Sequence, residues 1–157
     1  EKGFELYESH GHIHFYQKEL DTMQALVADW SHKLASNTPI NQVIICAFKN
    51  DSVDALNLLA RDTLMTQGKL SADSTLINDL KITEGERILF TQNDYQLGVK
   101  NGQFATVCSI QDTVIRVSFD NGKTVDIPKS AFIGVKYGYA ATVHKLQGYT
   151  GDYTYLM

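Results

Sequence analysis

The chain has 157 residues, of which 43% are hydrophobic and 20% are charged, and its formal net charge at pH 7 is −4. These values are typical of a globular protein and exclude extended disorder. The negative net charge also excludes a strong overall attraction to nucleic acid, so any contact with DNA has to come from a local patch or from a larger assembly.

The first half of the chain alternates predicted strands and helices. A short strand is predicted at His12–Gln17, and an amphipathic helix at Lys18–Leu34, where apolar residues recur every three or four positions. The continuous apolar run Val43–Phe48 predicts a strand that is buried on both faces. A second helix follows, with an asparagine or aspartate cap and a stop at Gly68. This alternation predicts a parallel sheet covered by helices.

The second half changes to short strands that alternate apolar and polar residues. Four such segments are separated by Gly, Asn and Asp: ERILFTQ, GQFATVCSI, TVIRVSF and KTVDIP. Asn121-Gly122, between two matching strands, predicts a tight primed turn. Together the strands predict a small antiparallel barrel inserted into the α/β sheet. The chain is expected to return to that sheet at about Val135, with YGYAATV and YTYLM as its last strands.

Neither cysteines nor histidines indicate a metal site. Cys46 and Cys108 lie in apolar runs and are predicted to be small buried hydrophobes, which fits a reducing cytoplasm. His10, His12 and His14 alternate as on one face of a strand, but no cysteine or acidic cluster accompanies them. Histidines on an exposed edge strand are therefore favoured over a metal centre. No apolar run is long enough to span a membrane.

Nucleotide-binding and nucleophile motifs are absent from the sequence. It contains no GxxxxGK[ST] loop, no GxGxxG fingerprint and no nucleophile elbow. We therefore expect the chain alone to hold no cofactor, to contain no catalytic residue and to be unable to hydrolyse a nucleotide.

The segment Thr142–Thr150, TVHKLQGYT, follows a predicted buried strand. The carboxyl ends of parallel strands are where α/β sheets bind ligands. Side chains with donors that suit phosphate oxygens of a nucleic-acid backbone are Thr142, His144 and Lys145. Residues that can bond to phosphate or ribose, or let an anion approach the backbone, are Gln147, Gly148 and Thr150. A plain turn is the alternative interpretation.

Three segments resemble superfamily 1 DNA helicases of the RecD type. YAATVHKLQGYT resembles their motif V, and IICAFKNDSVDALNLLAR resembles their motif IV region. GERILFTQNDYQLGVKNGQFATV, at Gly85–Val107, resembles the segment that leads into domain 2B, a Src-homology-3-like barrel. The leader GHIHFYQKELDTMQALVADW is most similar to conjugative relaxase–helicases of the TraA/TraI type. An exodeoxyribonuclease V alpha-type helicase is the alternative within this group.

The resemblance implies a fold and an activity. The fold is α/β, with a partial RecA-like parallel sheet (domain 2A, residues 1–84 and 135–157) and an inserted antiparallel barrel (domain 2B, residues 85–134). The activity is that of an ATP-dependent 5′→3′ DNA helicase in conjugative DNA transfer. Its full-length parent would bind ATP and Mg²⁺, and the partners would be single-stranded DNA and the first RecA-like domain of the same chain.

The resemblance also implies roles for single residues. Thr142, His144 and Lys145 would hold the DNA backbone. Residues coupled to the nucleotide would be Gln147, Gly148, Thr150, Lys49 and Asn50. For Lys49 and Asn50 the alternative is a solvated lysine and a helix cap.

Two other functions stay open. One is a non-catalytic DNA-binding or secretion-signal module from a degenerate helicase repeat. The other is a peptide-binding adaptor, which exposed aromatics such as Tyr95 and Phe104 on the barrel would favour. The family's Walker motifs and motif VI are absent, the sequence does not begin with Met, and it ends inside a predicted strand. We therefore expect it to be a fragment of a longer protein.

Overall fold

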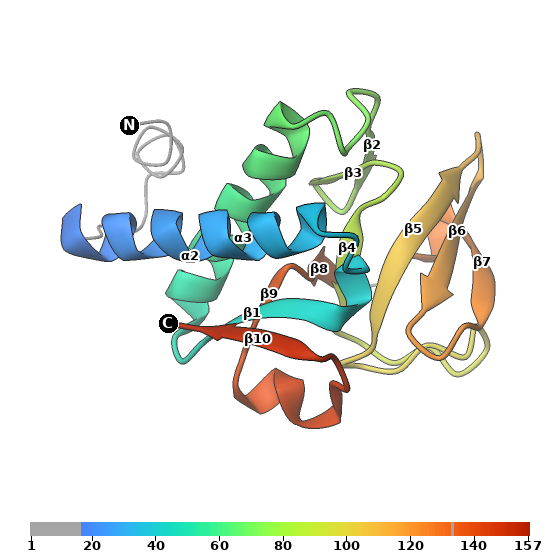
Figure 1. Cartoon of the computed structure of the whole chain (residues 1–157). Helices are drawn as coiled ribbons and strands as arrows, with labels where there is room; N and C mark the ends of the chain where they lie inside the picture. Colours follow the sequence, from blue (N-terminus) through green and yellow to red (C-terminus); the bar gives the residue numbers. More distant parts are fainter. Residues whose placement is uncertain (1–16, 133) are drawn as a thin grey trace. The chain divides into compact units, whose positions relative to one another are not determined.

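The computed structural model describes residues 17–132 and 134–157. Within these ranges the helical elements are α2 (Gln17–Ala35), η1 (Ile40–Gln42), α3 (Asn50–Thr66), η2 (Lys129–Ala131) and η3 (His144–Gly148). The strands are β1 (Val43–Ala47), β2 (Thr75–Ile77), β3 (Leu80–Ile82), β4 (Arg87–Phe90), β5 (Phe104–Ile110), β6 (Val114–Phe119), β7 (Thr124–Pro128), β8 (Val135–Tyr137), β9 (Ala140–Thr142) and β10 (Tyr153–Leu156) (Figure 1). The chain divides into two compact units. Of the described residues, one unit comprises 17–64 with 139–157, and the other comprises 65–132 with 134–138.

The first unit contains a parallel sheet in the order β10-β1-β9. Val43 lies opposite Tyr153 on one side of β1, and Ala47 lies opposite Thr142 on the other. Every residue of β1 is buried, as expected of a central strand covered on both faces. The predicted parallel α/β arrangement is therefore confirmed. β1 ends at Ala47, one residue before the predicted end at Phe48, and Phe48 is 72% exposed.

Helices α2 and α3 carry the apolar stripes that the sequence predicts. The buried apolar residues of α2 are Leu20, Met23, Val27 and Trp30, and those of α3 include Val53, Leu56, Ala60 and Leu64. Burying each large apolar side chain contributes about 1.5–3 kcal/mol. Trp30 packs edge-on against Tyr139, with ring centroids 5.7 Å apart. The predicted strand at His12–Gln17 lies outside the described residues, except that Gln17 begins α2.

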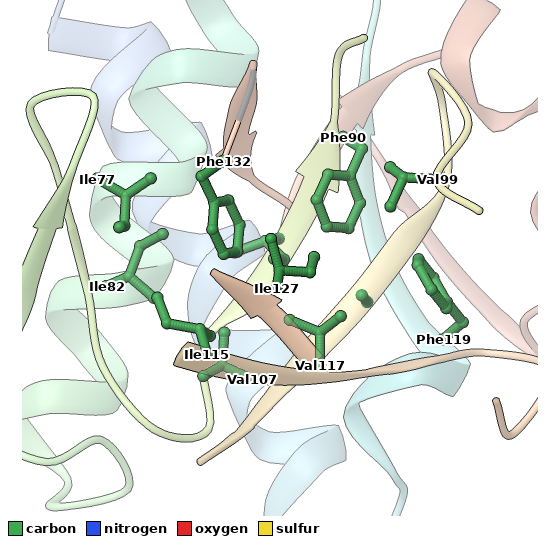
Figure 2. Packing of buried hydrophobic residues seen from close by; sticks show 12 residues of the cluster. Ile77, Ile82, Phe90, Val99, Val107, Ile115, Val117, Phe119, Ile127 and Phe132 are labelled. Atoms are coloured by element: carbon green, nitrogen blue, oxygen red, sulfur yellow. The ribbon is translucent and has the colours of Figure 1, made fainter. Parts of the chain in front are cut away.

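The second unit contains a five-stranded antiparallel sheet in the order β7-β6-β5-β4-β8 and a separate β2–β3 hairpin. The four predicted strands correspond to β4, β5, β6 and β7. Residues from the sheet and the hairpin form one hydrophobic core, which includes Ile77, Ile82, Phe90, Val117 and Phe132 (Figure 2). This core holds the hairpin to the sheet.

The β2–β3 hairpin is an element that the sequence interpretation did not include. Asn78 and Asp79 form its turn with positive φ angles of 49° and 67°, a conformation that these two residue types tolerate better than most. The Tyr137 hydroxyl donates a 2.7 Å hydrogen bond to the Lys81 carbonyl, which ties the hairpin to β8. The hairpin therefore lies in the antiparallel unit, ahead of the predicted insertion at residues 85–134.

The β6–β7 turn differs from the predicted primed turn. The Gly122 amide donates to the Phe119 carbonyl, and the Phe119 amide donates to the Lys123 carbonyl, so three residues connect the strands. Gly122 has φ of 89°, whereas Asn121 is not among the described residues with positive φ. A type I turn followed by a left-handed glycine has this pattern, whereas a primed type I turn needs two positive φ angles. The prediction of a primed turn was wrong.

The predicted strand YGYAATV is divided between the two units. β8 pairs with β4 in the antiparallel sheet, and β9 pairs with β1 in the parallel sheet. Gly138 lies between them, and a Cβ there would come within 2.9 Å of the Ile88 carbonyl carbon and oxygen. A residue with a side chain would collide with the β4 backbone. The chain therefore rejoins the parallel sheet at Ala140 rather than at Val135.

The two cysteines have different environments. Cys46 is buried in β1, and burial raises the pKa of its thiol. Cys108 is exposed, and the prediction that it is buried was wrong. The β5–β6 register shifts between Val107 and Ser109, so Cys108 is an extra residue that breaks the inward and outward alternation of β5.

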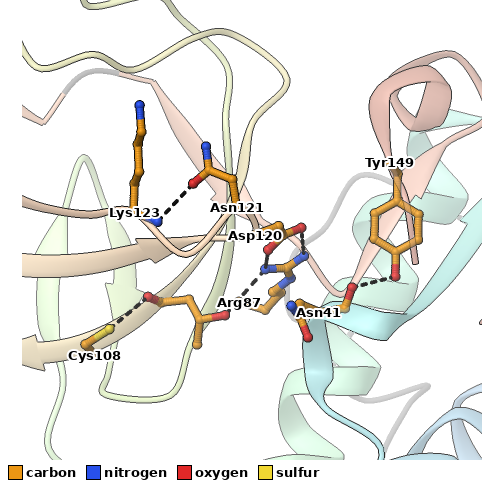
Figure 3. Close-up of polar contacts among 8 residues, drawn as sticks. Asn41, Arg87, Cys108, Asp120, Asn121, Lys123 and Tyr149 are labelled. Atoms are coloured by element: carbon orange, nitrogen blue, oxygen red, sulfur yellow. Dashed lines mark hydrogen bonds and ion pairs between the residues drawn. The ribbon is translucent and has the colours of Figure 1, made fainter. Parts of the chain in front are cut away.

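An ion pair joins β4 to the β6–β7 turn. The Arg87 guanidinium donates to both carboxylate oxygens of Asp120, at 2.6 and 2.7 Å (Figure 3). Arg87 is 2% exposed and lies 5.3 Å from the centroid of the Phe104 ring. A buried guanidinium needs such a bidentate partner to offset its desolvation, so this pair holds the turn in place.

Candidate functional site

The ends of two neighbouring parallel strands bring the predicted site residues together. Ala47 and Thr142 are the last residues of β1 and β9 and lie opposite each other. The Val143 amide donates a 3.3 Å hydrogen bond to the Ala47 carbonyl, which continues the pairing by one residue. Lys49 and Asn50 therefore leave the same edge of the sheet as the segment after Thr142. This is the edge where α/β sheets bind ligands.

The segment after β9 forms the short 3₁₀ helix η3, which holds His144 and Lys145 close to the strand end. The Lys145 amide donates to the Thr142 hydroxyl oxygen at 3.3 Å, and the Leu146 amide donates to the Val143 carbonyl at 3.2 Å. Thr142 was predicted only as a DNA donor. In the structure its oxygen also accepts a bond that shapes the turn, and its hydroxyl hydrogen is still able to donate outward.

The far end of the loop is anchored by an aromatic side chain that the sequence interpretation did not single out. The Tyr149 hydroxyl donates a 2.9 Å hydrogen bond to the Asn41 carbonyl in η1 (Figure 3). Gly151 packs against this side chain so closely that an added Cβ would lie 1.8 Å from the tyrosine oxygen. The sequence YTG shows a tyrosine near a glycine, but nothing in it indicates this contact.

Asn57, in α3, holds β9 from the side opposite β1. Its amide nitrogen donates to the Ala140 carbonyl at 3.0 Å, and its amide oxygen accepts from the Ala140 amide at 2.8 Å. Asn57 is 5% exposed. One side chain thus supplies both bonds that a neighbouring strand would make with Ala140. Sequence reasoning missed Asn57, since a single asparagine within a helix gives no signal of a partner 83 positions away.

The edge is polar and cationic, with apolar side chains beside the cations. Lys49, Asn50, His144, Gln147 and Thr150 are exposed, and Thr142 and Lys145 are half-buried. Two large apolar residues are also exposed here, Phe48 at 72% and Val143 at 43%. No carboxylate occurs in residues 48–50 or 142–150, whereas Asp51 and Asp152 follow these segments. Cations with adjacent flat apolar surface suit a nucleic-acid chain.

Neither a metal centre nor a membrane segment occurs in the described part of the chain. In residues 17–132 and 134–157 no three His, Cys, Asp or Glu side chains are grouped so as to hold a metal ion. His10, His12 and His14 lie outside the described residues. No described helix has the length and hydropathy needed to cross a membrane.

The two aromatics that bear on the adaptor alternative differ in exposure. Tyr95 is 86% exposed, whereas Phe104 is 6% exposed and belongs to the interior of the antiparallel unit. The second unit therefore does not present these two rings as a shared aromatic surface.

Comparison with known proteins gives relatives over nearly the whole chain. No family model matches it. Over 158 aligned positions, 97% of the chain, it is 27% identical to the conjugal transfer protein TraA of Agrobacterium fabrum. Over 64 positions, 41% of the chain, it is 33% identical to the ATP-dependent RecD2 DNA helicase of Deinococcus radiodurans. The chain is a superfamily 1 helicase-like relative of TraA. It spans only 14% of the length of that TraA and 9% of that RecD2.

Solved structures with a similar fold include two of Pif1 from Bacteroides. The structure of that helicase in complex with ADP-AlF3 and ssDNA matches with a TM-score of 0.54 at 22% identity, over 83% of this chain and 38% of the Pif1 chain. Bacteroides Pif1 bound to ssDNA matches with a TM-score of 0.52 at 21% identity, over 88% and 42%. The TraA-related chain thus has a helicase-like mixed α/β fold, with a parallel three-stranded sheet and antiparallel sheets.

Proposed function

We propose that this TraA-related chain is part of the motor of an ATP-dependent 5′→3′ DNA helicase in conjugative transfer, and that it binds single-stranded DNA at the carboxyl edge of its parallel sheet. Thr142, His144 and Lys145 contact the phosphate backbone there. The observation that carries the proposal is the pairing of Ala47 with Thr142. It brings the motif IV-like and motif V-like segments, both of which carry cations, to a single edge.

The nucleotide-coupling residues form the second part of the proposal. Exposed donors on the same edge can turn toward a nucleotide held mainly by another domain, since this chain has no phosphate-binding loop of its own. The residues assigned to this role are Gln147, Gly148, Thr150, Lys49 and Asn50. Coupling then needs the first RecA-like domain of the same protein, where ATP and Mg²⁺ bind.

The two units take the domain roles implied by the helicase resemblance. The parallel-sheet unit is an incomplete RecA-like domain 2A, and the antiparallel unit is domain 2B, a Src-homology-3-like barrel. The sequence predicts the inserted domain at residues 85–134, and the shared core supports including the β2–β3 hairpin with it. The protein acts in the cytoplasm, where reducing conditions keep the thiols of Cys46 and Cys108 free.

Binding of fluorescent single-stranded DNA to the chain, followed by anisotropy, tests the proposed edge. His144→Ala and Lys145→Ala each remove a donor to phosphate and should weaken binding by about 1–3 kcal/mol, which is about 5- to 150-fold. Lys145→Ala should also make binding less dependent on salt concentration, because one fewer cation replaces condensed counterions.

His32→Ala is the matched control, because His32 is an exposed histidine in the last turn of α2 and outside the proposed edge. Its affinity for single-stranded DNA should equal that of the wild type. If His144→Ala and Lys145→Ala also bind like the wild type, the proposed DNA contact is wrong.

A further inference from the structure

The most exposed large apolar side chain described in the antiparallel unit lies on a tightly organised loop. Tyr95 is 86% exposed. The Asp94 and Val99 backbones exchange hydrogen bonds of 2.8 and 2.9 Å, which close a hairpin around residues 95–98. One carboxylate oxygen of Asp94 accepts from the amides of Gln96 and Leu97, both at 3.1 Å. The backbone on both sides of the tyrosine is therefore held by bonds within the loop.

The base of this loop is attached to the sheet and to the core. The side-chain oxygen of Asn93 accepts from the Asn101 amide at 2.9 Å. The Gly102 amide donates to the Phe90 carbonyl of β4 at 2.7 Å. Val99 is 1% exposed and packs in the core of the unit (Figure 2). A ring presented by such a loop loses little backbone entropy when a ligand covers it.

The surroundings of Tyr95 are polar rather than apolar. The neighbouring side chains Gln92, Gln96 and Lys100 are exposed. Among the described residues of this unit, the other exposed large apolar side chains are Met65 and Leu76, outside the loop. A protein interface is built around a contiguous apolar centre. A nucleic-acid base needs one flat ring to stack on, with amides and a cation near it. The loop fits a base better than a protein, because it has one exposed ring with amide side chains and a lysine near it.

We propose that Tyr95 is a stacking platform for a base of single-stranded DNA, and that the antiparallel unit thereby provides a DNA contact of its own in addition to the edge at His144 and Lys145. This rests on the proposed function, because it assigns a second contact to the same ligand. The Tyr95 contact acts on bases, whereas His144 and Lys145 act on the phosphate backbone. The two contacts can therefore be separated by experiment.

The test compares two oligonucleotides of equal length, oligo-dT and one with abasic positions throughout its central part, by anisotropy at several salt concentrations. Tyr95→Ala should weaken oligo-dT binding by about 5- to 150-fold, the range for loss of one base–aromatic stack. Tyr95→Phe keeps the ring and should bind like the wild type. The salt dependence should not change, because no cation is removed.

The abasic oligonucleotide distinguishes this inference from the proposed function. The effect of Tyr95→Ala should vanish there, whereas the effect of His144→Ala should persist. Leu76→Ala is the control, since it removes a 65% exposed apolar side chain from the same unit but outside the loop. It should bind both oligonucleotides like the wild type. Protection of the Val99 amide from hydrogen exchange should show that Tyr95→Ala keeps its loop.

Two outcomes would overturn the inference. If Tyr95→Ala binds oligo-dT like the wild type while His144→Ala binds more weakly, Tyr95 contacts no base and the proposed function stands; Tyr95 is then free to contact a protein. If the wild-type chain binds no oligonucleotide at all, the proposed function and the Tyr95 contact both fail.

Discussion

Asn57 positions the candidate site without being part of it. Its amide group satisfies both backbone groups of Ala140, two residues before Thr142. Buried backbone groups without partners cost about 1–3 kcal/mol each. A single side chain from α3 therefore fixes the path of the strand that leads to His144 and Lys145.

Asn57→Ala should lower the free energy of unfolding of the parallel-sheet unit by about 2 kcal/mol or more, because it leaves the Ala140 amide and carbonyl buried and unpaired. Faster hydrogen exchange of the Ala140 amide, read by NMR, would locate the loss. Thr66→Ala, an exposed change at the end of the same helix, should alter stability by less than about 0.5 kcal/mol. Unchanged exchange at Ala140 in Asn57→Ala would show that the amide clamp is unimportant.

Single residues also show where the sequence was a poor guide. Phe48 continues an apolar run, and Cys108 lies within one, yet both are exposed. The run VIICAF has no polar residue to mark the end of β1, and the bulge at Cys108 depends on pairing with β6, which is a tertiary property. His144 and Lys145 could be proposed from the sequence because their motif is local. Asn57 and Tyr149 were missed because their partners are far away in the sequence.

At the scale of elements, the spacing of apolar residues predicted those helices and strands that are long enough for the spacing to repeat. The helices α2 and α3 have several apolar repeats each, and β6 alternates over its six residues. The β2–β3 hairpin has strands of only three residues, too short for alternation to stand out. The segment YGYAATV looked continuous because both of its parts are apolar, whereas the division at Gly138 is set by contact with β4.

Gly138→Ala tests this division. The added Cβ would lie 2.9 Å from the Ile88 backbone, and backbone cannot rotate away as a side chain can. We expect a loss of about 1–3 kcal/mol in stability, the usual cost of overpacking, together with weaker protection of amides in β4 and β8. Gly134→Ala is a comparison in which the nearest obstacle is the Thr91 side chain.

Removing the Thr91 side chain should restore stability to Gly134→Ala but not to Gly138→Ala. Thr91→Ala combined with Gly134→Ala should regain most of the lost stability, whereas Thr91→Ala should not help Gly138→Ala. Thermal unfolding of the four variants measures the difference. A Gly138→Ala protein as stable as the wild type would mean that β4 and β8 tolerate a side chain between them.

At the scale of the whole molecule, the chain matches only a small part of the length of its relatives. It spans 14% of TraA of Agrobacterium fabrum, and the proposed coupling needs groups that its sequence does not contain. The fold class could be predicted because alternating strands and helices followed by short strands is a strong pattern. The roles of single residues in coupling could not be derived in the same way, because the partners that the proposal gives them lie outside this chain.

The proposed coupling is therefore best tested in the longer helicase that the proposal assumes. His144→Ala should weaken DNA binding while sparing ATP binding. Gly148→Val adds bulk where the proposal has the backbone approach phosphate, so DNA binding should survive while DNA-stimulated ATP hydrolysis falls steeply. The 157-residue chain alone should release no phosphate from ATP, with or without DNA. If both variants match the wild type in DNA affinity and stimulated hydrolysis, a non-catalytic module is the better description.

The different environments of the two thiols also have a practical consequence. Cys46 is buried and its thiol has a raised pKa, whereas Cys108 is exposed on β5. A maleimide dye should therefore react first at Cys108, since the accessible thiolate is the reactive form. This attaches one fluorophore to the antiparallel unit with no mutation. Energy transfer from that dye to an acceptor at either end of a bound oligonucleotide would then report the polarity with which the strand lies along the protein.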